Sequence, residues 1–416
     1  MEGAESMSTK SPITPFSKNR DFDFETRIAI GLSVAGAGDP GEILAATQRV
    51  KKNDQEGWFS TWHALADRTM DAADRSAQGG HRVSAASAYL RASAYYANAV
   101  NAASSLDDSG RLTAAFQRQQ EAWRGFVEHT SVAVTPVEIP YEQDPLPGYL
   151  FRAPARVADG NPLLVAVNGS DGSLAALWAC CVAAGLERGY DVLVFDGPGQ
   201  QSQLFEKNVP FRPDWEHVLG PVHDFVAALE GVDRERIAVY GISQGGYWVT
   251  RAIAFEHRFA AAIVDPGVLD VSTSWTAHIP ASLLKHLDNG DVEKFDEQMA
   301  LAMKFFPSAG RTWAFRARPY GATGYAETLT AVREYDATDV ASRIRTPLLI
   351  IDPENEQFWP GQAQRLAELT PDVSTLLTFT AAEGADGHCQ PLARAVTAER
   401  MFDWLDERLA DVGAGE

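Results

Sequence analysis

Short, continuous apolar segments that alternate with helical patterns constrain the fold of this chain more than any other feature. They lie in its last two thirds: Leu163–Val167, Asp191–Phe195, Ile237–Tyr240, Ala260–Val264 and Leu348–Ile351. Strands that are apolar on both faces must be covered on both faces, and such strands separated by helices form a parallel sheet between two helical layers. We therefore predict an α/β fold with a mostly parallel, doubly wound sheet.

Residues 136–416 are predicted to form this α/β unit. A hairpin opens it, because residues 137–141 and 148–151 flank a Pro/Gly turn. The preceding residues 21–135 are predicted to form an N-terminal helical domain, since apolar residues recur at three-and-four spacing in residues 84–103 and 112–129. Residues 1–20 are predicted to be a flexible tail.

The stretch between the fourth and fifth apolar segments is far too long for one crossover connection. We predict that residues 269–335 form a helical lid insertion beside the strand ends, where ligands bind in open α/β sheets. Its aromatic residues Trp275, Trp313 and Tyr320 are candidates for contact with a substrate. The alternative is that these aromatic residues pack in a core.

The net charge of the chain excludes two classes of binding partner. Its 416 residues include 36 Lys and Arg and 56 Asp and Glu, a net charge of −20, which repels phosphate backbones and anionic membrane surfaces. No apolar run approaches the ~20 residues of a membrane helix, and the first twenty residues lack the apolar core of a signal peptide. The three cysteines contain no Cys-x-x-Cys pair. We expect a cytoplasmic enzyme with a small-molecule substrate and with no metal, cofactor, nucleic acid or membrane partner.

A candidate nucleophile lies at the end of the third apolar segment. There Gly241-Ile-Ser-Gln-Gly places Ser243 in a Gly-x-Ser-x-Gly motif between a predicted strand and a predicted helix over residues 246–257. Glycines at the flanking positions let strand and helix approach closely, and the sharp turn presents the serine Oγ. The alternative is a glycine-rich turn with an ordinary serine.

A serine hydroxyl needs a base, and the base in turn needs a carboxylate to orient it. His388, in the loop Glu383-Gly-Ala-Asp-Gly-His, is the one histidine beyond the last predicted strand region, and we predict that it is the base. The acid is expected just after Leu348–Ile351, where Asp352, Glu354 and Glu356 compete. We favour Glu356, with Asp352 as the alternative.

An oxyanion hole requires backbone N–H groups opposite the nucleophile. We assign one to Gln244, which follows the serine, and the other to Ser170 in the glycine-containing loop after the first apolar segment, with Asp171 beside it. Asp196, in Asp-Gly-Pro-Gly-Gln, is predicted to cap a turn. Cys389 is predicted to pack rather than to react.

Together these motifs resemble the FrsA-like branch of the α/β-hydrolase superfamily. The resemblance rests on the helical N-terminal part with Arg91-Ala-Ser-Ala-Tyr-Tyr96, on Asn168-Gly-Ser-Asp, on Phe195-Asp-Gly-Pro-Gly-Gln, on Gly241-Ile-Ser-Gln-Gly-Gly and on the loop that contains His388. That branch includes bacterial esterase-like proteins, a dihydroxypseudooxynicotine hydrolase of the nicotine pathway, and fungal hydrolases that shorten polyketide chains. Several members cleave a carbon–carbon bond next to a ketone.

The resemblance also implies roles for individual residues. In the nicotine-pathway enzyme an acidic residue of the oxyanion loop takes part, and Asp171 corresponds to it here, with Asp in place of Glu. Glu356 stands where Asp is commoner. The resemblance further implies homodimerisation through the N-terminal helices.

These observations predict a serine hydrolase that attacks a carbonyl carbon of a bulky, aromatic or polyketide-like molecule. We favour cleavage of a carbon–carbon bond next to a ketone, in which a buried, protonated Asp171 could supply the proton that a carbanion leaving group needs. A carboxylesterase or lactonase, and acyl transfer or cyclisation on the same triad, are alternatives. The alternative of another class is a non-catalytic binding or regulatory protein on the same scaffold.

Overall fold

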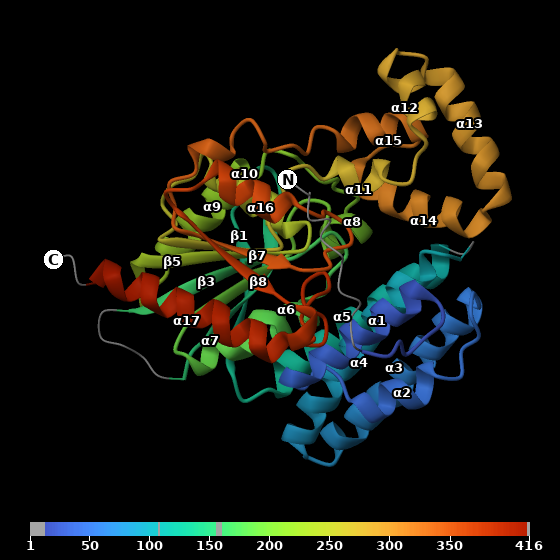
Figure 1. Ribbon diagram of the computed structural model, residues 1–416. Helices are drawn as coiled ribbons and strands as arrows, with labels where there is room; N and C mark the ends of the chain where they lie inside the picture. Colours follow the sequence, from blue (N-terminus) through green and yellow to red (C-terminus); the bar gives the residue numbers. More distant parts are fainter. Residues whose placement is uncertain (1–12, 107–108, 155–159, 414–416) are drawn as a thin grey trace.

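A computed structural model describes residues 13–106, 109–154 and 160–413, so residues 1–12 of the predicted tail lie outside the described part. An eight-stranded sheet forms the centre of the molecule (Figure 1). The strands are β1 (Ala133–Ile139), β2 (Leu146–Arg152), β3 (Asn161–Val167), β4 (Asp191–Phe195), β5 (Val232–Ile242), β6 (Ala261–Asp265), β7 (Leu348–Pro353) and β8 (Ser374–Phe379). Their order is β1-β2-β4-β3-β5-β6-β7-β8. β2 pairs antiparallel with β1 and β4, and the other pairs are parallel, which confirms the predicted sheet.

The order in which successive strands are placed in the sheet reverses at β3. β4 lies on one side of β3 and β5 lies on the other. The register of β3 and β5 places Val167 opposite Gly241, so the loops that follow these two strands begin side by side. Open α/β sheets bind ligands at such a switch point.

Helices cover both faces of the sheet, as predicted (Figure 1). One layer contains α6 (Leu174–Leu177), the π-helical turn η2 (Trp178–Val182), α7 (Ala183–Glu187) and α17 (Arg394–Gly413), and the other contains α9 (Glu216–Ala227), α10 (Gly245–Ile253) and α16 (Gln362–Leu369). Alternate strand residues enter the two cores: Leu164 and Ala166 face the first layer, whereas Leu163 and Val165 face the second. The predicted helix over residues 246–257 is too long. It ends at Ile253, where two successive backbone amides turn back to the Ala252 carbonyl.

Helices precede the sheet in the sequence. They are α1 (Arg20–Gly31), η1 (Leu32–Ala35), α2 (Pro40–Thr47), α3 (Gln55–Gln78), α4 (Arg82–Ala103) and α5 (Ser109–His129), called here the N-terminal helices. Buried alanines along α4 let α3 and α5 pack closely on either side of it. Aromatic contacts join these helices to the sheet layer: Trp123 packs on Phe151 at 6.2 Å and Phe126 on Trp178 at 4.9 Å between ring centroids. The two parts therefore share one hydrophobic core.

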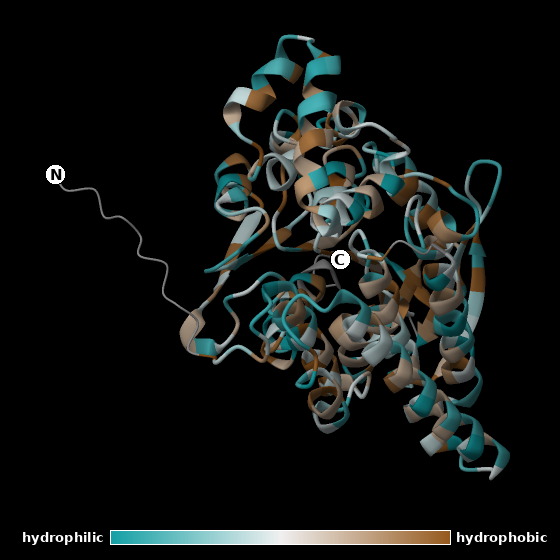
Figure 2. Cartoon of the chain, turned by 90° about the vertical axis from the view of Figure 1, so that its right-hand side faces the viewer, coloured by the Kyte–Doolittle hydropathy of each residue, from teal (hydrophilic) through white to brown (hydrophobic). Residues whose placement is uncertain are grey.

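The chain between β6 and β7 is helical. It contains α11 (Ser272–Thr276), α12 (Ala281–Asp288), α13 (Val292–Phe305), α14 (Pro307–Ala317), η3 (Arg318–Tyr320) and α15 (Tyr325–Val332), called here the α11–α15 segment. It has a small core of its own around Phe295 and Met299. Figure 2 shows α12 and α13 at the top and the N-terminal helices at the bottom, with hydrophobic residues gathered on the strands between them. No helix in the described ranges has both the length and the apolar character needed to span a membrane.

Candidate active site

The turn between β5 and α10 holds Ser243 in a conformation that L-residues rarely adopt. Its φ is +56°, in the left-handed region. Glycines make the turn possible: a Cβ on Gly241 would lie 2.2 Å from the carbonyl oxygen of Gly245, and a Cβ on Gly245 would lie 2.8 Å from that of Val167. The Ser243 amide donates to the Asp265 carbonyl at 2.6 Å, which ties the turn to the end of β6. The hydroxyl is thereby presented at the carboxyl edge of the sheet.

The Ser243 hydroxyl lies within hydrogen-bond distance of a histidine that is bonded to a carboxylate. The distance from Ser243 Oγ to His388 Nε2 is 2.9 Å, and His388 Nδ1 lies 2.8 and 3.0 Å from the two carboxylate oxygens of Glu356. Because a carboxylate only accepts, Nδ1–H donates to Glu356, and Nε2 is left to accept from the serine. The histidine and glutamate side chains are 6% and 5% exposed. Chemically, this arrangement can take a proton from the hydroxyl and stabilise the imidazolium that results.

Among the three carboxylates that compete in the sequence, Glu356 contacts His388. Its Oε1 also accepts from the amides of Phe358 at 2.8 Å and Trp359 at 3.3 Å. Burial by itself raises the pKa of Glu356, but His388 and these two amides outweigh it and lower the pKa below the ordinary value. Asp352 instead accepts from Gln364 Nε2 at 2.7 Å at both oxygens, and burial raises its pKa.

The third carboxylate, Glu354, faces another segment. Its Oε2 accepts from the amide of Ala381 at 2.8 Å. Glu354 therefore fixes the segment after β8. The structure brings Glu356, and not Asp352 or Glu354, into hydrogen-bond contact with the imidazole.

The loop after β3 lies against the nucleophile. A Cβ on Gly169 would stand 2.8 Å from Ser243 Cβ, so the loop backbone passes directly beside the serine. The side-chain amide of Gln200 supports this loop by donating to the carbonyl oxygens of Asn168 at 2.8 Å and Gly169 at 3.2 Å. The Asp-Gly-Pro-Gly-Gln motif that contains Gln200 gave no sign of this role, because the two segments meet only in the folded chain.

Of the two predicted oxyanion donors, Gln244 directly follows Ser243, and Ser170 follows Gly169, whose backbone lies beside the serine. No acceptor in the described part of the chain takes the backbone N–H of Ser170 or Gln244. Both amides therefore remain available to a negatively charged oxygen near Ser243.

Asp171 does not meet the condition set for it as a proton donor. That role required a buried carboxyl, whereas the side chain is exposed and its Oδ1 accepts from the Ser170 hydroxyl at 3.2 Å. The loop geometry explains the difference, because Gln201 Nε2 donates to the Asp171 carbonyl at 3.1 Å and holds the backbone, not the carboxyl, inward. Asp196 is buried, and its Oδ2 accepts from the hydroxyl and amide of Ser202 at 2.6 and 3.2 Å, as expected of a turn cap. Burial raises the pKa of Asp196 to about 6.

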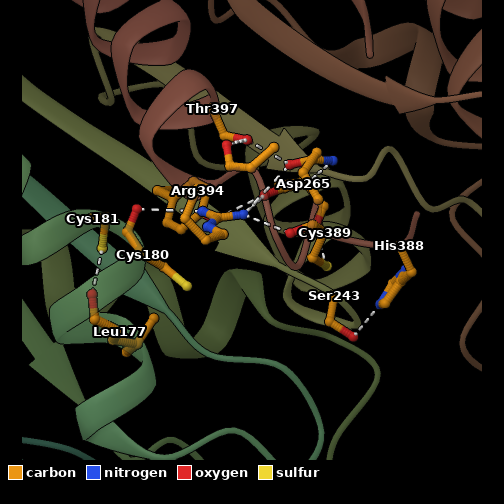
Figure 3. A network of polar contacts seen from close by, with 12 residues as sticks. Leu177, Cys180, Cys181, Ser243, Asp265, His388, Cys389, Arg394 and Thr397 are labelled. Carbon is orange, nitrogen blue, oxygen red and sulfur yellow. Dashed lines mark hydrogen bonds and ion pairs between the residues drawn. The ribbon is translucent and has the colours of Figure 1, made fainter. Parts of the chain in front are cut away.

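A buried polar network lies behind the serine and the histidine (Figure 3). Arg394 Nη1 donates to Asp265 Oδ2 at 3.0 Å and to the Cys389 carbonyl at 2.8 Å, while its Nη2 donates to Tyr240 Oη at 3.1 Å. Gln390 Nε2 adds a 3.0 Å bond to Asp265 Oδ1. The network joins the end of β6 to the loop that carries the histidine. Burial raises the pKa of the Cys389 thiol well above its ordinary range, which fits the predicted packing role.

The three aromatic candidates of the α11–α15 segment form a chain of rings that reaches the site at one end. Tyr320 Oη donates to Gln244 Oε1 at 3.3 Å. Trp275 packs edge-on against Tyr320 at 5.6 Å, and Trp313 packs edge-on against Trp275 at 5.0 Å. Tyr320 therefore lies next to the nucleophile turn, whereas Trp313 is separated from Tyr320 by the ring of Trp275.

The N-terminal helices also reach the site, which the sequence analysis did not predict. The ring of Phe24, on α1, lies 6.4 Å from that of His388 and 5.9 Å from that of Phe358. Phe358 and Trp359 pack on the imidazole at 4.7 and 5.6 Å. No local motif marks Phe24, since its position depends on how α1 docks.

Comparisons with known proteins identify the family of this chain. A sequence profile described as "Alpha/beta hydrolase family" matches residues 163–400. "Alpha/beta hydrolase xenA" of Xenoacremonium sinensis is 31% identical over 94% of this chain and 97% of its own length. The "20-hydroxy-prefusarin hydrolase FUS2" of Gibberella moniliformis is 28% identical over 94% of this chain and 96% of its own.

A solved structure gives the same fold. The crystal structure of 2,6-dihydroxy-pseudo-oxynicotine hydrolase superposes with a TM-score of 0.71 and covers 91% of this chain and 95% of its own, at 21% sequence identity. At that identity the likeness concerns the fold, and it confirms the α/β-hydrolase architecture that the resemblance implied. The chain belongs to the alpha/beta hydrolase family.

Proposed function

We propose that this chain is a serine hydrolase that cleaves a bulky, aromatic or polyketide-like small molecule at a carbonyl carbon. The observation that carries the proposal is the hydrogen-bonded series from Ser243 Oγ through His388 to Glu356. In such a series the hydroxyl becomes nucleophilic as the histidine removes its proton.

The reaction then has two stages. Ser243 attacks the carbonyl carbon while His388 takes its proton, and the amides of Ser170 and Gln244 bind the oxyanion. Glu356 keeps the imidazole oriented and stabilises its positive charge. The leaving group departs with a proton, and water, deprotonated by the same histidine, releases the acyl group from the serine.

The aromatic surroundings support a ring-bearing substrate. The rings of Phe24 and Phe358 lie against the imidazole, and Tyr320 is hydrogen-bonded to Gln244 of the nucleophile turn. Planar rings of a substrate pack favourably against such side chains. The relative named 20-hydroxy-prefusarin hydrolase agrees with a substrate of some size. Within this class we favour a carbon–carbon bond next to a ketone over a carboxylic ester, and the α11–α15 segment would act as the lid.

Labelling with a fluorophosphonate probe tests the nucleophile. Folded protein should be labelled at Ser243, and the Ser243→Ala and His388→Ala variants should not react. His217→Ala removes an exposed histidine from α9 and should label like the unsubstituted protein. Failure to label Ser243 in folded protein would reject the hydrolase and favour a binding role for the scaffold.

The bond that is cleaved requires a second assay. Aryl β-diketones and p-nitrophenyl esters should be compared as substrates of the same preparation. Turnover of the diketones supports carbon–carbon hydrolysis, whereas rapid hydrolysis of the esters alone would leave an esterase.

A further inference from the structure

The turn after β4 holds the side chain of Gln200 in place. β3 and β4 pair in parallel, with Ala166 opposite Val194, so the loops that follow these strands begin side by side at the carboxyl edge of the sheet. Within the turn, Gln200 Oε1 accepts from the Gly197 amide at 2.8 Å, and Gln200 is 1% exposed. The side-chain amide is therefore anchored at its oxygen, which leaves its NH₂ group to donate to the neighbouring loop.

That NH₂ group binds the peptide that carries a proposed oxyanion donor. Gln200 Nε2 donates to the carbonyl oxygens of Asn168 at 2.8 Å and Gly169 at 3.2 Å. The Gly169 carbonyl and the Ser170 N–H belong to one peptide unit. This unit is trans and planar, so its carbonyl and its N–H point in opposite directions. A bond that fixes the direction of the Gly169 carbonyl therefore also directs the Ser170 N–H away from Gln200.

The nucleophile lies against the same peptide. A Cβ on Gly169 would lie 2.8 Å from Ser243 Cβ and 3.3 Å from Ser243 Oγ. The nitrogen of Ser170 is two covalent bonds from the Gly169 Cα, so it is close to the hydroxyl. The Gly169 amide is already taken, because it donates to Asn168 Oδ1 at 3.0 Å. Ser170, and not Gly169, therefore supplies the N–H for an oxyanion at Ser243.

The next glutamine holds the loop on the other side of Ser170. Gln201 Nε2 donates to the Asp171 carbonyl at 3.1 Å, and Gln119 Nε2, on α5, donates to Gln201 Oε1 at 2.9 Å. Gln201 is buried and has a φ of +30°, a positive value that L-residues rarely adopt. Two consecutive glutamines thus fix the carbonyls before and after Ser170, and the N-terminal helices support the second of them.

We propose that Gln200 is a positioning residue that aims the Ser170 N–H at the oxyanion formed when Ser243 attacks a carbonyl carbon. The proposal rests on the hydrolase activity proposed above. Gln200 acts through the peptide that it binds, and no bond to Gln200 forms or breaks in the reaction. Its hydrogen bond to the Gly169 carbonyl also polarises this peptide, which makes the Ser170 N–H a stronger donor. A donor that is already aimed needs no reorganisation when the oxyanion forms.

This role predicts equal effects on ketone and ester substrates. With either substrate, an oxyanion forms at the attacked carbonyl before the leaving group departs. The Ser170 N–H stabilises the negative charge of the transition state much more than it stabilises the neutral carbonyl of the bound substrate. Misdirection of this N–H should therefore lower kcat and leave KM nearly unchanged.

The first test compares Gln200→Met with the unsubstituted enzyme. Methionine has a similar length and no N–H donor. We expect kcat to fall by about 10- to 100-fold with an aryl β-diketone, and by the same factor with a p-nitrophenyl ester, since complete loss of one oxyanion donor costs about 10²–10³-fold. KM should stay within about threefold. Gln117→Met, which changes an exposed glutamine of α5, is the matched control and should alter neither kcat nor KM.

A pair of ketone inhibitors separates positioning from general damage to the site. An aryl trifluoromethyl ketone forms a tetrahedral adduct with the serine, and this adduct carries the oxyanion. The matching methyl ketone binds without forming the adduct. In Gln200→Met the affinity for the trifluoromethyl ketone should fall by the same factor as kcat/KM, while the affinity for the methyl ketone should stay within about threefold.

Gln200→Glu tests the donor with almost no change of shape, and it decides the question if Gln200→Met does not fold. A protonated carboxyl can donate to the Gly169 carbonyl, whereas a carboxylate only accepts. The kcat of this variant, divided by that of the unsubstituted enzyme at the same pH, should therefore fall as the pH rises and the carboxyl ionises. The titration of His388 is common to both proteins and cancels in this ratio. Circular dichroism at each pH verifies that the variant is folded.

The outcomes separate this proposal from the proposed function. A Gln200→Met variant that cleaves both substrates at the original rate overturns the role of Gln200, and so does a Gln200→Glu ratio that is independent of pH. Equal losses of affinity for the two ketone inhibitors assign Gln200 a structural role and also overturn it. In these cases the unsubstituted protein still reacts with the fluorophosphonate at Ser243. Absence of that labelling overturns the hydrolase itself.

Discussion

Removal of the guanidinium of Arg394 should destabilise the protein strongly, because the side chain compensates a buried charge. Arg394 Nη1 and Asp265 Oδ2 are 3.0 Å apart, and their side chains are 2% and 0% exposed. In Arg394→Met the Asp265 carboxylate keeps bonds from Gln390 and Tyr240 but loses its counter-charge. Loss of one partner of a buried ion pair costs about 3–5 kcal/mol, and we expect the free energy of unfolding to fall by this amount.

Urea denaturation followed by tryptophan fluorescence measures the effect, and a double-mutant cycle with Asp265→Asn isolates the pair. The double variant buries no unpaired charge, so it should be more stable than the sum of the single losses implies, by about 1–3 kcal/mol. The same lesion should slow the labelling of Ser243 in folded protein, because the network fixes Cys389 next to the histidine. A loss below about 1 kcal/mol in Arg394→Met would refute the reasoning.

Three further changes test other contacts of the site. Glu356→Gln should lower kcat by about 10³–10⁴-fold in steady-state assays. The pKa of Glu356 is lower in the folded protein than in the unfolded chain. The ionised carboxylate therefore stabilises the fold above the pKa of the unfolded state, and this stabilisation is lost as the pH falls through the pKa of the folded state. The difference in unfolding free energy between the unsubstituted protein and Glu356→Gln, measured with urea, should therefore shrink below pH ~4. Gly169→Ala puts a Cβ 2.8 Å from that of Ser243 and should slow fluorophosphonate labelling at least ~10-fold; unchanged labelling would contradict the close approach. Gly31→Ala places a Cβ 1.7 Å from the Pro391 carbonyl oxygen and should lower the melting temperature through a cost of about 1–3 kcal/mol, whereas an unchanged melting curve would show that α1 can yield there.

Local sequence patterns were sufficient to predict the sheet and two of the central side chains. The apolar segments are fully buried strands, since each must be covered on both faces. The turn that presents Ser243 is encoded by its own glycines, and His388 follows from its place in a loop beyond the last strands. The sequence favoured Glu356 without excluding Asp352, because Asp352, Glu354 and Glu356 occupy one short segment. The amides that cap Glu356 and turn it towards the histidine belong to the fold of that segment.

The burial of a side chain in the site was harder to predict than the loop that carries it. The sequence placed Asp171 in the correct loop but gave no indication that its carboxyl points to solvent. That direction depends on Gln201, from the turn after β4, which holds the Asp171 carbonyl. A contact between segments thirty residues apart has no periodicity or motif that would reveal it, so the exposure of a loop side chain could not be derived from composition or spacing.

The same limit explains why the sequence did not reveal that α1 borders the site, where Phe24 lies next to the ring of His388. A helix far from the nucleophile in the sequence contributes to a site only through docking, and here the docking is tight: Gly31 packs directly on the Pro391 carbonyl, three residues after His388. Phe22, stacked on Trp58 at 4.2 Å, anchors the other end of α1 to α3. These two attachments fix the intervening Phe24 beside the rings of His388 and Phe358.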